Sequence, residues 1–149
     1  MLKHLLKRNK RRWYENGLSF QCIQCGRCCT GEPGYIWITE NEIPALADAL
    51  GETRESFICT YARNVRGRIS LKEMSNGDCI LLDKNRQCRL YEQRPVQCRT
   101  FPFWPENLRT RKDWDRLAND CPGINTGQRH SADEITRISD MVDGHVNPN

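Results

Sequence analysis

The chain has 149 residues, of which 38% are hydrophobic and nine are cysteines. This length is typical of one domain, and a domain of this size buries only about two thirds of the surface that its unfolded chain exposes. We therefore expect a thin core that disulfides or bound metal must reinforce. The sequence contains no apolar stretch long enough to predict a membrane span.

Positive charge is concentrated at the amino end. The formal net charge is +4, yet residues 1 to 12 contain six Lys and Arg residues and no acidic residue. The rest of the chain is therefore mildly acidic, which argues against a basic domain that binds nucleic acid. We expect residues 1–19 to form a basic tail that is mainly solvated. Contact of this tail with nucleic acid, anionic lipid or a protein partner stays open as an alternative.

The number and spacing of the cysteines favour metal over disulfides. The amino end, MLKHLLKRNKRRWYENG, has no apolar run of the length found in signal peptides. We therefore expect a cytoplasmic protein, and disulfides are rare in that reducing compartment. An odd number of cysteines, several of them two residues apart, then predicts metal ligands.

The first predicted elements follow the first cysteines. The stretch FQCIQCGRCCTGEPGYIW lacks helical periodicity, so it predicts a turn that leads into a short strand at residues 35 to 38. Thr39 and Glu42 have the spacing of a capping box, which predicts a helix from there to Gly51.

Helix and hairpin signals alternate in the middle of the chain. Phe57, Tyr61 and Val65 recur at helical spacing and predict a second helix over about residues 53 to 65. The segments RISLKEM and DCILLD flank the turn pair Asn76-Gly77 and predict the two strands of a hairpin.

The last third of the chain predicts an irregular segment and two helices. The prolines of FPFWPENL predict ordered but non-helical backbone over residues 99 to 108. A helix around RKDWDRLAND should then lead to Cys121. A capping box at Ser131 and Glu134 starts a short amphipathic helix. Its apolar face comprises Ile135, Ile138, Met141 and Val142.

Eight of the nine cysteines form the predicted ligand set. Sulfurs two residues apart on a tight turn can bind one ion, and Gly26 supplies the permissive backbone for such a turn. Neighbouring side chains rarely point at the same small ion, so Cys28 and Cys29 should serve different metal positions. Cys59 has no partner at ligand spacing, and we expect a core or surface thiol there. The predicted ligands are Cys22, Cys25, Cys28, Cys29, Cys79, Cys88, Cys98 and Cys121.

The identity of the metal stays open at this point. Thiolate ligands suit zinc, and eight of them would supply two tetrahedral sites, but they suit iron as well, including a 4Fe-4S cluster. Arg27, Arg89 and Arg99 stand beside predicted ligands, where a cation could offset the charge of the thiolates. The three histidines lie in the terminal segments, so we expect neither a mixed Cys and His site nor a Cys-His nucleophile.

Several segments together resemble a known family. The segments QCIQCGRCC, NGDCILLD, CRLYEQRPVQCRTFPFWP and CPG are similar to the YkgJ-type cysteine-cluster family, which has a CxxCxxCC signature. The resemblance covers roughly residues 20 to 125 and implies zinc or iron chelation by the eight cysteines, with Cys59 outside the motif. A flagellin lysine methylase is similar in its cysteine motif, and its association with an iron–sulfur cluster adds weight to iron.

These observations predict a small, irregular α+β domain. We expect a short β-hairpin and several short helices to be organised around a cysteine-ligated metal centre, with residues 20–125 as the metal-binding domain and residues 126–149 as a carboxyl-terminal segment. The leading hypothesis is a metal-binding protein with a structural or redox role and an unknown protein partner, rather than an enzyme.

Two other functions stay open. One is an iron–sulfur enzyme of electron or group transfer, although the sequence contains no recognisable hydrolase or nucleotide site. The other is an adaptor for nucleic acid or protein that would use the basic tail and an aromatic and basic segment. The residues of that segment are Phe101, Phe103, Trp104, Arg109, Arg111, Lys112 and Trp114.

Overall fold

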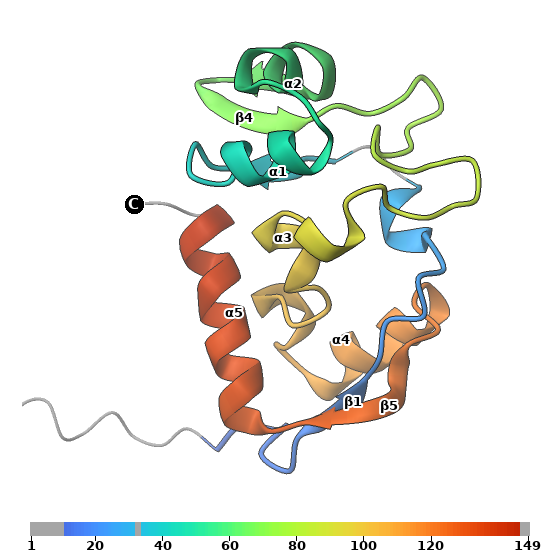
Figure 1. Cartoon of the computed structure of the whole chain (residues 1–149). Helices are drawn as coiled ribbons and strands as arrows, with labels where there is room; N and C mark the ends of the chain where they lie inside the picture. Colours follow the sequence, from blue (N-terminus) through green and yellow to red (C-terminus); the bar gives the residue numbers. More distant parts are fainter. Residues whose placement is uncertain (1–10, 32–33, 147–149) are drawn as a thin grey trace, which may run out of the picture.

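The computed structural model describes residues 11–31 and 34–146, with side chains up to residue 142. Within these residues the chain forms five α-helices and two small antiparallel sheets, so the predicted α+β class is confirmed. Figure 1 shows the two sheets near opposite ends of the molecule, with long loops between them. The 3-10 turns are η1 (Arg27–Cys29), η2 (Tyr91–Gln93), η3 (Pro105–Asn107) and η4 (Leu117–Asn119), and η1 contains two of the cysteines.

The first core lies between a three-stranded sheet and two helices. The strands are β2 (Trp37–Ile38), β3 (Ala62–Val65) and β4 (Arg68–Leu71), in the order β2-β4-β3, and the helices are α1 (Ile43–Ala49) and α2 (Arg54–Tyr61). Fully buried Ile43 and Phe57 lie at its centre. The first core therefore comes from the first half of the chain together with a few leucines that follow β4.

Polar contacts lie at or near the start of both helices of the first core. The backbone N–H and hydroxyl of Thr39 donate to the Glu42 carboxylate, but α1 begins only at Ile43, with Glu42 rather than Thr39 at its N-cap, so the predicted start of this helix is three residues too early. At the next helix the Thr53 hydroxyl accepts from the N–H of Ser56, which satisfies one donor that the helix leaves unpaired.

The hairpin lies earlier in the chain than the sequence predicts. The second helix ends at Tyr61, and the residues predicted to complete it form β3, which pairs with β4. Arg66 and Gly67 have φ of 52° and 84°, which is the left-handed pair that a two-residue hairpin turn requires. The Asn76-Gly77 turn closes only an isolated bridge between Glu73 and Cys79, so the predicted strand over DCILLD is wrong.

The second core gathers both ends of the described chain. Strand β1 (Leu18–Phe20) pairs antiparallel with β5 (Ile124–His130), and neither strand was predicted. Helices α3 (Val96–Arg99), α4 (Arg111–Arg116) and α5 (Ala132–Val146) complete this part of the fold. The Trp114 side chain is fully buried at its centre and stacks on Phe103 with 5.6 Å between ring centroids.

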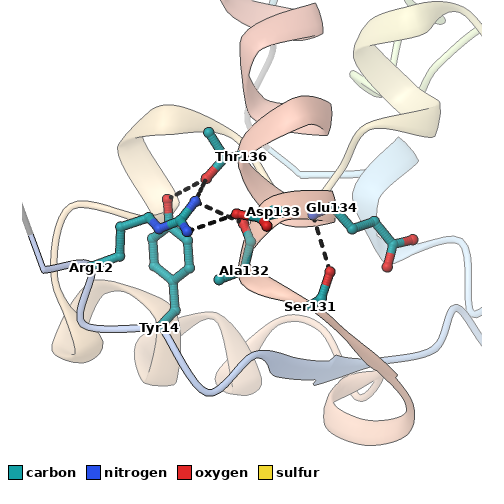
Figure 2. Close-up of polar contacts among 7 residues, drawn as sticks. All are labelled: Arg12, Tyr14, Ser131, Ala132, Asp133, Glu134 and Thr136. Carbon is teal, nitrogen blue, oxygen red and sulfur yellow. Dashed lines mark hydrogen bonds and ion pairs between the residues drawn. The ribbon is translucent and has the colours of Figure 1, made fainter. Parts of the chain in front are cut away.

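Part of the predicted basic tail packs against the second core. Trp13 and Tyr14 contact its buried residues, and the Trp13 indole donates to the carbonyl of Leu108 at 2.7 Å. Arg12 donates to Asp133 at 2.8 Å and to the Thr136 hydroxyl at 2.7 Å, which attaches this segment to α5 (Figure 2). Residues 1–10 lie outside the described residues. The division at residue 19 stays a prediction.

Helix α5 begins as the sequence predicts. The N–H of Glu134 donates to the Ser131 hydroxyl (Figure 2), and Ile135 and Val142 are buried. Met141 is 47% exposed, so its assignment to the apolar face is wrong. Among the described residues, no helix combines the length and apolar character needed to cross a membrane.

Candidate metal centre

One cavity brings all eight predicted ligands together. It has a volume of about 320 Å³, and its wall includes cysteines from five separate parts of the chain. Cys59 is not in this wall and lies exposed on α2. The lining cysteines are Cys22, Cys25, Cys28, Cys29, Cys79, Cys88, Cys98 and Cys121.

The first group of cysteines lies on a tight turn between β1 and η1. Gly26 has φ of +74°, and a Cβ atom there would lie 2.3 Å from the carbonyl oxygen of Arg86. Only glycine allows this approach, because a side chain would overlap the backbone of the loop that leads to Cys88. The Gly26 turn therefore holds the first cysteines against the middle cysteines.

Cys79 and Cys88 lie on two successive tight loops. Cys79 forms an isolated bridge with Glu73, and Cys88 forms one with Leu82. The N–H of Cys79 also donates to the carbonyl of Cys29 at 2.8 Å, which ties its loop to η1. In the second loop one carboxylate oxygen of Asp83 accepts the N–H groups of residues 85 and 87 at 2.8 and 3.0 Å. Short polar contacts thus fix the sulfurs without any regular strand.

The last two predicted ligands lie in or just after helical turns. Cys98 lies in α3, whose first residue follows Pro95, and Cys121 follows η4. A Cβ atom on Gly123 would lie 2.2 Å from the carbonyl oxygen of Gln21, whose N–H donates to the carbonyl of Gly123. This close approach brings Cys121 beside the residue that precedes Cys22.

The cavity lies where the two cores meet. Cys79 and Cys88 pack against the first core, whereas Cys121 packs against the second. Phe20, Phe101 and Trp104 contribute aromatic surface to the wall. A second cavity of about 270 Å³ shares part of this wall, namely Cys28, Cys29, Ile36, Leu71, Cys79 and Trp104.

Burial opposes ionisation of most of these thiols. Burial is the main cause that raises the pKa of Cys79, Cys88, Cys98 and Cys121, and neighbouring thiolates raise each of them further. The Cys29 thiol donates to the Cys28 sulfur, which lowers the pKa of Cys28 to about 6 and raises that of Cys29 strongly. A bound cation would favour the thiolate forms that burial and mutual repulsion disfavour.

The cations beside the cavity differ from those that the sequence indicates. Of the three predicted arginines, only Arg27 lies in the wall, and Arg89 instead lies over the ring of Tyr61 with 5.6 Å to its centroid. Arg86 and Arg94 also line the cavity and were missed. No sequence signal separates them from other arginines near a cysteine, because the direction of each side chain depends on the loops.

The sulfurs surround a space rather than a single ready-made coordination shell. Within residues 11–31 and 34–146, no three Cys, His, Asp or Glu side chains stand close enough together to hold one ion as they are. The donor set nevertheless fits a soft metal, because eight thiols from five segments converge on one cavity. Which of these residues bind metal stays a prediction.

His130 and two rings of the aromatic and basic segment, Phe103 and Trp114, lie outside the cavity wall. The ring of His130 is near the carbonyl of Phe20 at 3.1 Å and does not line the cavity, while His4 and the His145 side chain fall outside the described residues. In the aromatic and basic segment, Phe103 and Trp114 belong to the second core, so neither ring is available to stack on a base.

Comparison with known proteins agrees with this cysteine pattern. Residues 21–122 match the CxxCxxCC family, which is described as a "Putative zinc- or iron-chelating domain". The chain belongs to this family. Membership of the CxxCxxCC family confirms the resemblance drawn from the cysteine motifs, and the matched region begins just before Cys22 and ends just after Cys121.

Relatives add little about the role of the site. An uncharacterized protein of Methanocaldococcus jannaschii is 28% identical over 136 residues, which are 87% of this chain and 71% of that protein. No solved structure matches the chain.

Proposed function

We propose that this CxxCxxCC protein binds zinc or iron through the eight cysteines of the cavity, in two neighbouring sites of four thiolates each. One observation carries the proposal: every cysteine of the family motif lines the same cavity, and the ninth cysteine does not. Ordinary buried thiols would be expected to scatter through the cores as small apolar side chains. Convergence of eight of them on one hollow is what shared metal binding requires.

Proximity divides the cysteines into two groups. Burial is the main cause that raises the pKa of Cys121, and the charges of Cys25 and Cys22 raise it further, which supports placing these three cysteines in one group. Burial and then the charge of Cys79 raise the pKa of Cys98, and Cys88 contributes in the same direction. After the effects of Cys28 and of burial, Cys79 and Cys88 likewise raise the pKa of Cys29.

The charge of Cys28 raises the pKa of Cys121 in the first group and of Cys98 in the second. Assigning Cys28 to the first group gives four predicted ligands in each. We call the two groups the knuckle set and the turn set. The knuckle set is Cys22, Cys25, Cys28 and Cys121. The turn set is Cys29, Cys79, Cys88 and Cys98.

This division follows the two cores. The turn set contains the cysteines that pack against the first core, and the knuckle set contains Cys121, which packs against the second. Adjacent Cys28 and Cys29 then belong to different sites and keep those sites close together. Metal in both sets would crosslink the two cores across the cavity, which supports a structural role.

The identity of the metal determines whether the site can also transfer electrons. Zinc in a closed tetrathiolate site contributes folding energy and has no redox chemistry, whereas an iron–sulfur cluster transfers single electrons. The residues of the two sets suit either metal, since both are bound by thiolates. Anaerobic purification separates the two: a brown protein that absorbs near ~400 nm favours an iron–sulfur centre, and a colourless one with bound zinc favours a structural site.

The division into sets is tested by single Cys→Ser variants. Cys25→Ser should lose the metal of the knuckle set and Cys98→Ser that of the turn set, so each should retain about half of the parent's metal if the sites fill independently. Cys59→Ser is the matched control and should retain all of it. Elemental analysis of the purified variants measures this ratio.

Two outcomes would contradict the proposal. A parent protein purified anaerobically without stoichiometric zinc or iron would remove the proposed function altogether. A parent with metal whose Cys25→Ser and Cys98→Ser variants retained as much as Cys59→Ser would remove these cysteines from the ligand set.

A further inference from the structure

Tyr91 and Arg94 lie in the cavity wall and reach both sets of cysteines. Tyr91 and Cys22, of the knuckle set, line the same cavity, and a hydrogen bond between their side chains is the main cause that raises the pKa of Tyr91. The guanidinium of Arg94 lies over the Tyr91 ring, 4.2 Å from its centroid, and its Nε donates to the Tyr91 carbonyl at 3.0 Å. The stacking and the hydrogen bond together fix the direction of the Arg94 side chain.

Arg94 lines the same cavity as the cysteines of both sets, so its guanidinium is available to the thiolates there. Burial raises the pKa of Cys88 and Cys98, and the Arg94 charge acts in the opposite direction on both. It also adds to the Cys29 hydrogen bond in lowering the pKa of Cys28. One cation in the cavity wall therefore favours the thiolate form of three predicted ligands.

We propose that Tyr91 and Arg94 form a positioning pair that sets the charge and the hydrogen bonding of the metal centre, and so determines how tightly it holds its metal. This inference rests on the proposed function of the eight cysteines. Neither residue is a ligand. Arg94 would supply a fixed positive charge, and Tyr91 would both donate to a sulfur and hold the guanidinium in place.

A cation and a hydrogen-bond donor are both favourable beside a thiolate metal centre. Four thiolates around a divalent ion leave a net negative charge, which is unfavourable beside an apolar wall. Arginine stays protonated in proteins, so its charge is available at every physiological pH. Hydrogen bonds to ligand sulfurs and nearby charges also set the reduction potential of iron–sulfur clusters. The pair therefore matters for either metal.

Arg89 provides a matched comparison within the same loop. It follows Cys88 directly, yet it lies over the Tyr61 ring at the first core and is not part of the cavity wall. If any cation close in sequence to the cysteines could strengthen metal binding, replacing Arg89 or Arg94 would weaken it equally. We expect only the replacement of Arg94 to weaken it, because only Arg94 lines the cavity.

The test compares metal retention among variants of the loaded protein. We would titrate anaerobically purified Arg94→Gln, Arg94→Lys, Tyr91→Phe and Arg89→Gln with a coloured chelator and measure the concentration that removes half of the metal. Partners that support metal ligands typically contribute about 10–100-fold to affinity, so Arg94→Gln should need roughly tenfold less chelator than the parent. Tyr91→Phe should need several-fold less, Arg94→Lys should recover much of the loss, and Arg89→Gln should match the parent.

The outcomes separate this inference from the proposed function. A parent without metal would remove both. A parent with metal, together with an Arg94→Gln variant that loses it no more readily than Arg89→Gln, would overturn the positioning role and leave the proposed function intact. If Arg94→Gln does not fold, Tyr91→Phe against Arg89→Gln decides, and equal retention by those two overturns the inference. If the metal is iron, the reduction potential of the centre should also be lower in Arg94→Gln than in the parent. The Arg94 cation stabilises the reduced state, which is more negative, and the variant lacks this stabilisation.

Discussion

Replacing Gly26 with alanine tests whether the two loops must meet for metal to bind. Gly26 has φ of +74°, and an added Cβ would lie 2.3 Å from the carbonyl oxygen of Arg86. A left-handed alanine costs about 1–2 kcal/mol by itself. The overlap adds to this, because ordinary contact begins at 3.4 Å and the Arg86 backbone would have to retreat by about an ångström.

Displacement of that size exceeds what a metal site tolerates. Metal–ligand distances are held to within about 0.2 Å, so moving the first cysteines away from the Cys88 loop should abolish binding in at least one set. Gly51→Ala is the matched control. Gly51 has φ of +68°, and nothing lies within 4 Å of an added Cβ. Gly51→Ala should therefore lose only the stability that a left-handed alanine costs. Each kcal/mol lost lowers the melting temperature by about 2–4 °C in a chain of this size.

The assay is the metal-to-protein ratio of both variants together with their thermal unfolding. We expect Gly51→Ala to keep its metal and Gly26→Ala to lose part or all of it and to melt at a lower temperature than Gly51→Ala. The reasoning would be refuted if Gly26→Ala held as much metal as Gly51→Ala, because the close contact with Arg86 would then be dispensable for the site.

The remaining predictions concern metal, pH and the amino end. Chelation under reducing conditions should lower the melting temperature sharply, because structural zinc contributes on the order of 10 kcal/mol; an unchanged circular dichroism melt would exclude a structural role. Every thiol of the turn set has a raised pKa in the metal-free fold and holds its proton at pH 7. When the turn set binds a metal ion, its thiols should release these protons. The affinity for the metal should therefore fall as pH falls, by about tenfold per pH unit for each proton released. Calorimetry in buffers of different ionisation heat counts the protons. Deleting residues 1–10 should leave the metal content unchanged, and a deletion variant without metal would contradict this prediction. Arg12→Ala should lower the melting temperature slightly, because it loses contacts to Asp133 and Thr136, and the decrease should be smaller in high salt.

Local signals in the sequence predicted the helices better than the strands. The Ser131 cap starts α5 as expected, because a cap depends only on residues a few positions away, and α1 forms where a helix is predicted although it begins three residues later than the Thr39 cap implies. The β1-β5 pair was missed because it joins residues more than a hundred positions apart, and neither strand has an apolar alternation of its own. The hairpin was misplaced because Arg66 gave no sign that it would adopt a left-handed backbone.

The candidate site was partly visible in the sequence. Cysteine spacing and family resemblance selected the eight residues that line the cavity and left out Cys59, which the structure places on an exposed helix face. The grouping into sets and the role of Arg94 depend on how separate loops approach each other, at contacts such as Gly26 with Arg86 and Gly123 with Gln21. Spacing along one chain carries no information about such contacts.

The pairing of β1 with β5 has a consequence for synthesis on the ribosome. Leu18 lies opposite His130, so the second core cannot close until β5 has emerged. The first core draws on residues between Ile38 and Leu90 and can form earlier. Cys22 and Cys25 therefore emerge long before Cys121, the residue proposed to share their metal site. A nascent chain stalled before β5 would leave these two thiols open to oxidants and to other metals, so the synthesis of β5 limits how early the proposed knuckle set can be completed.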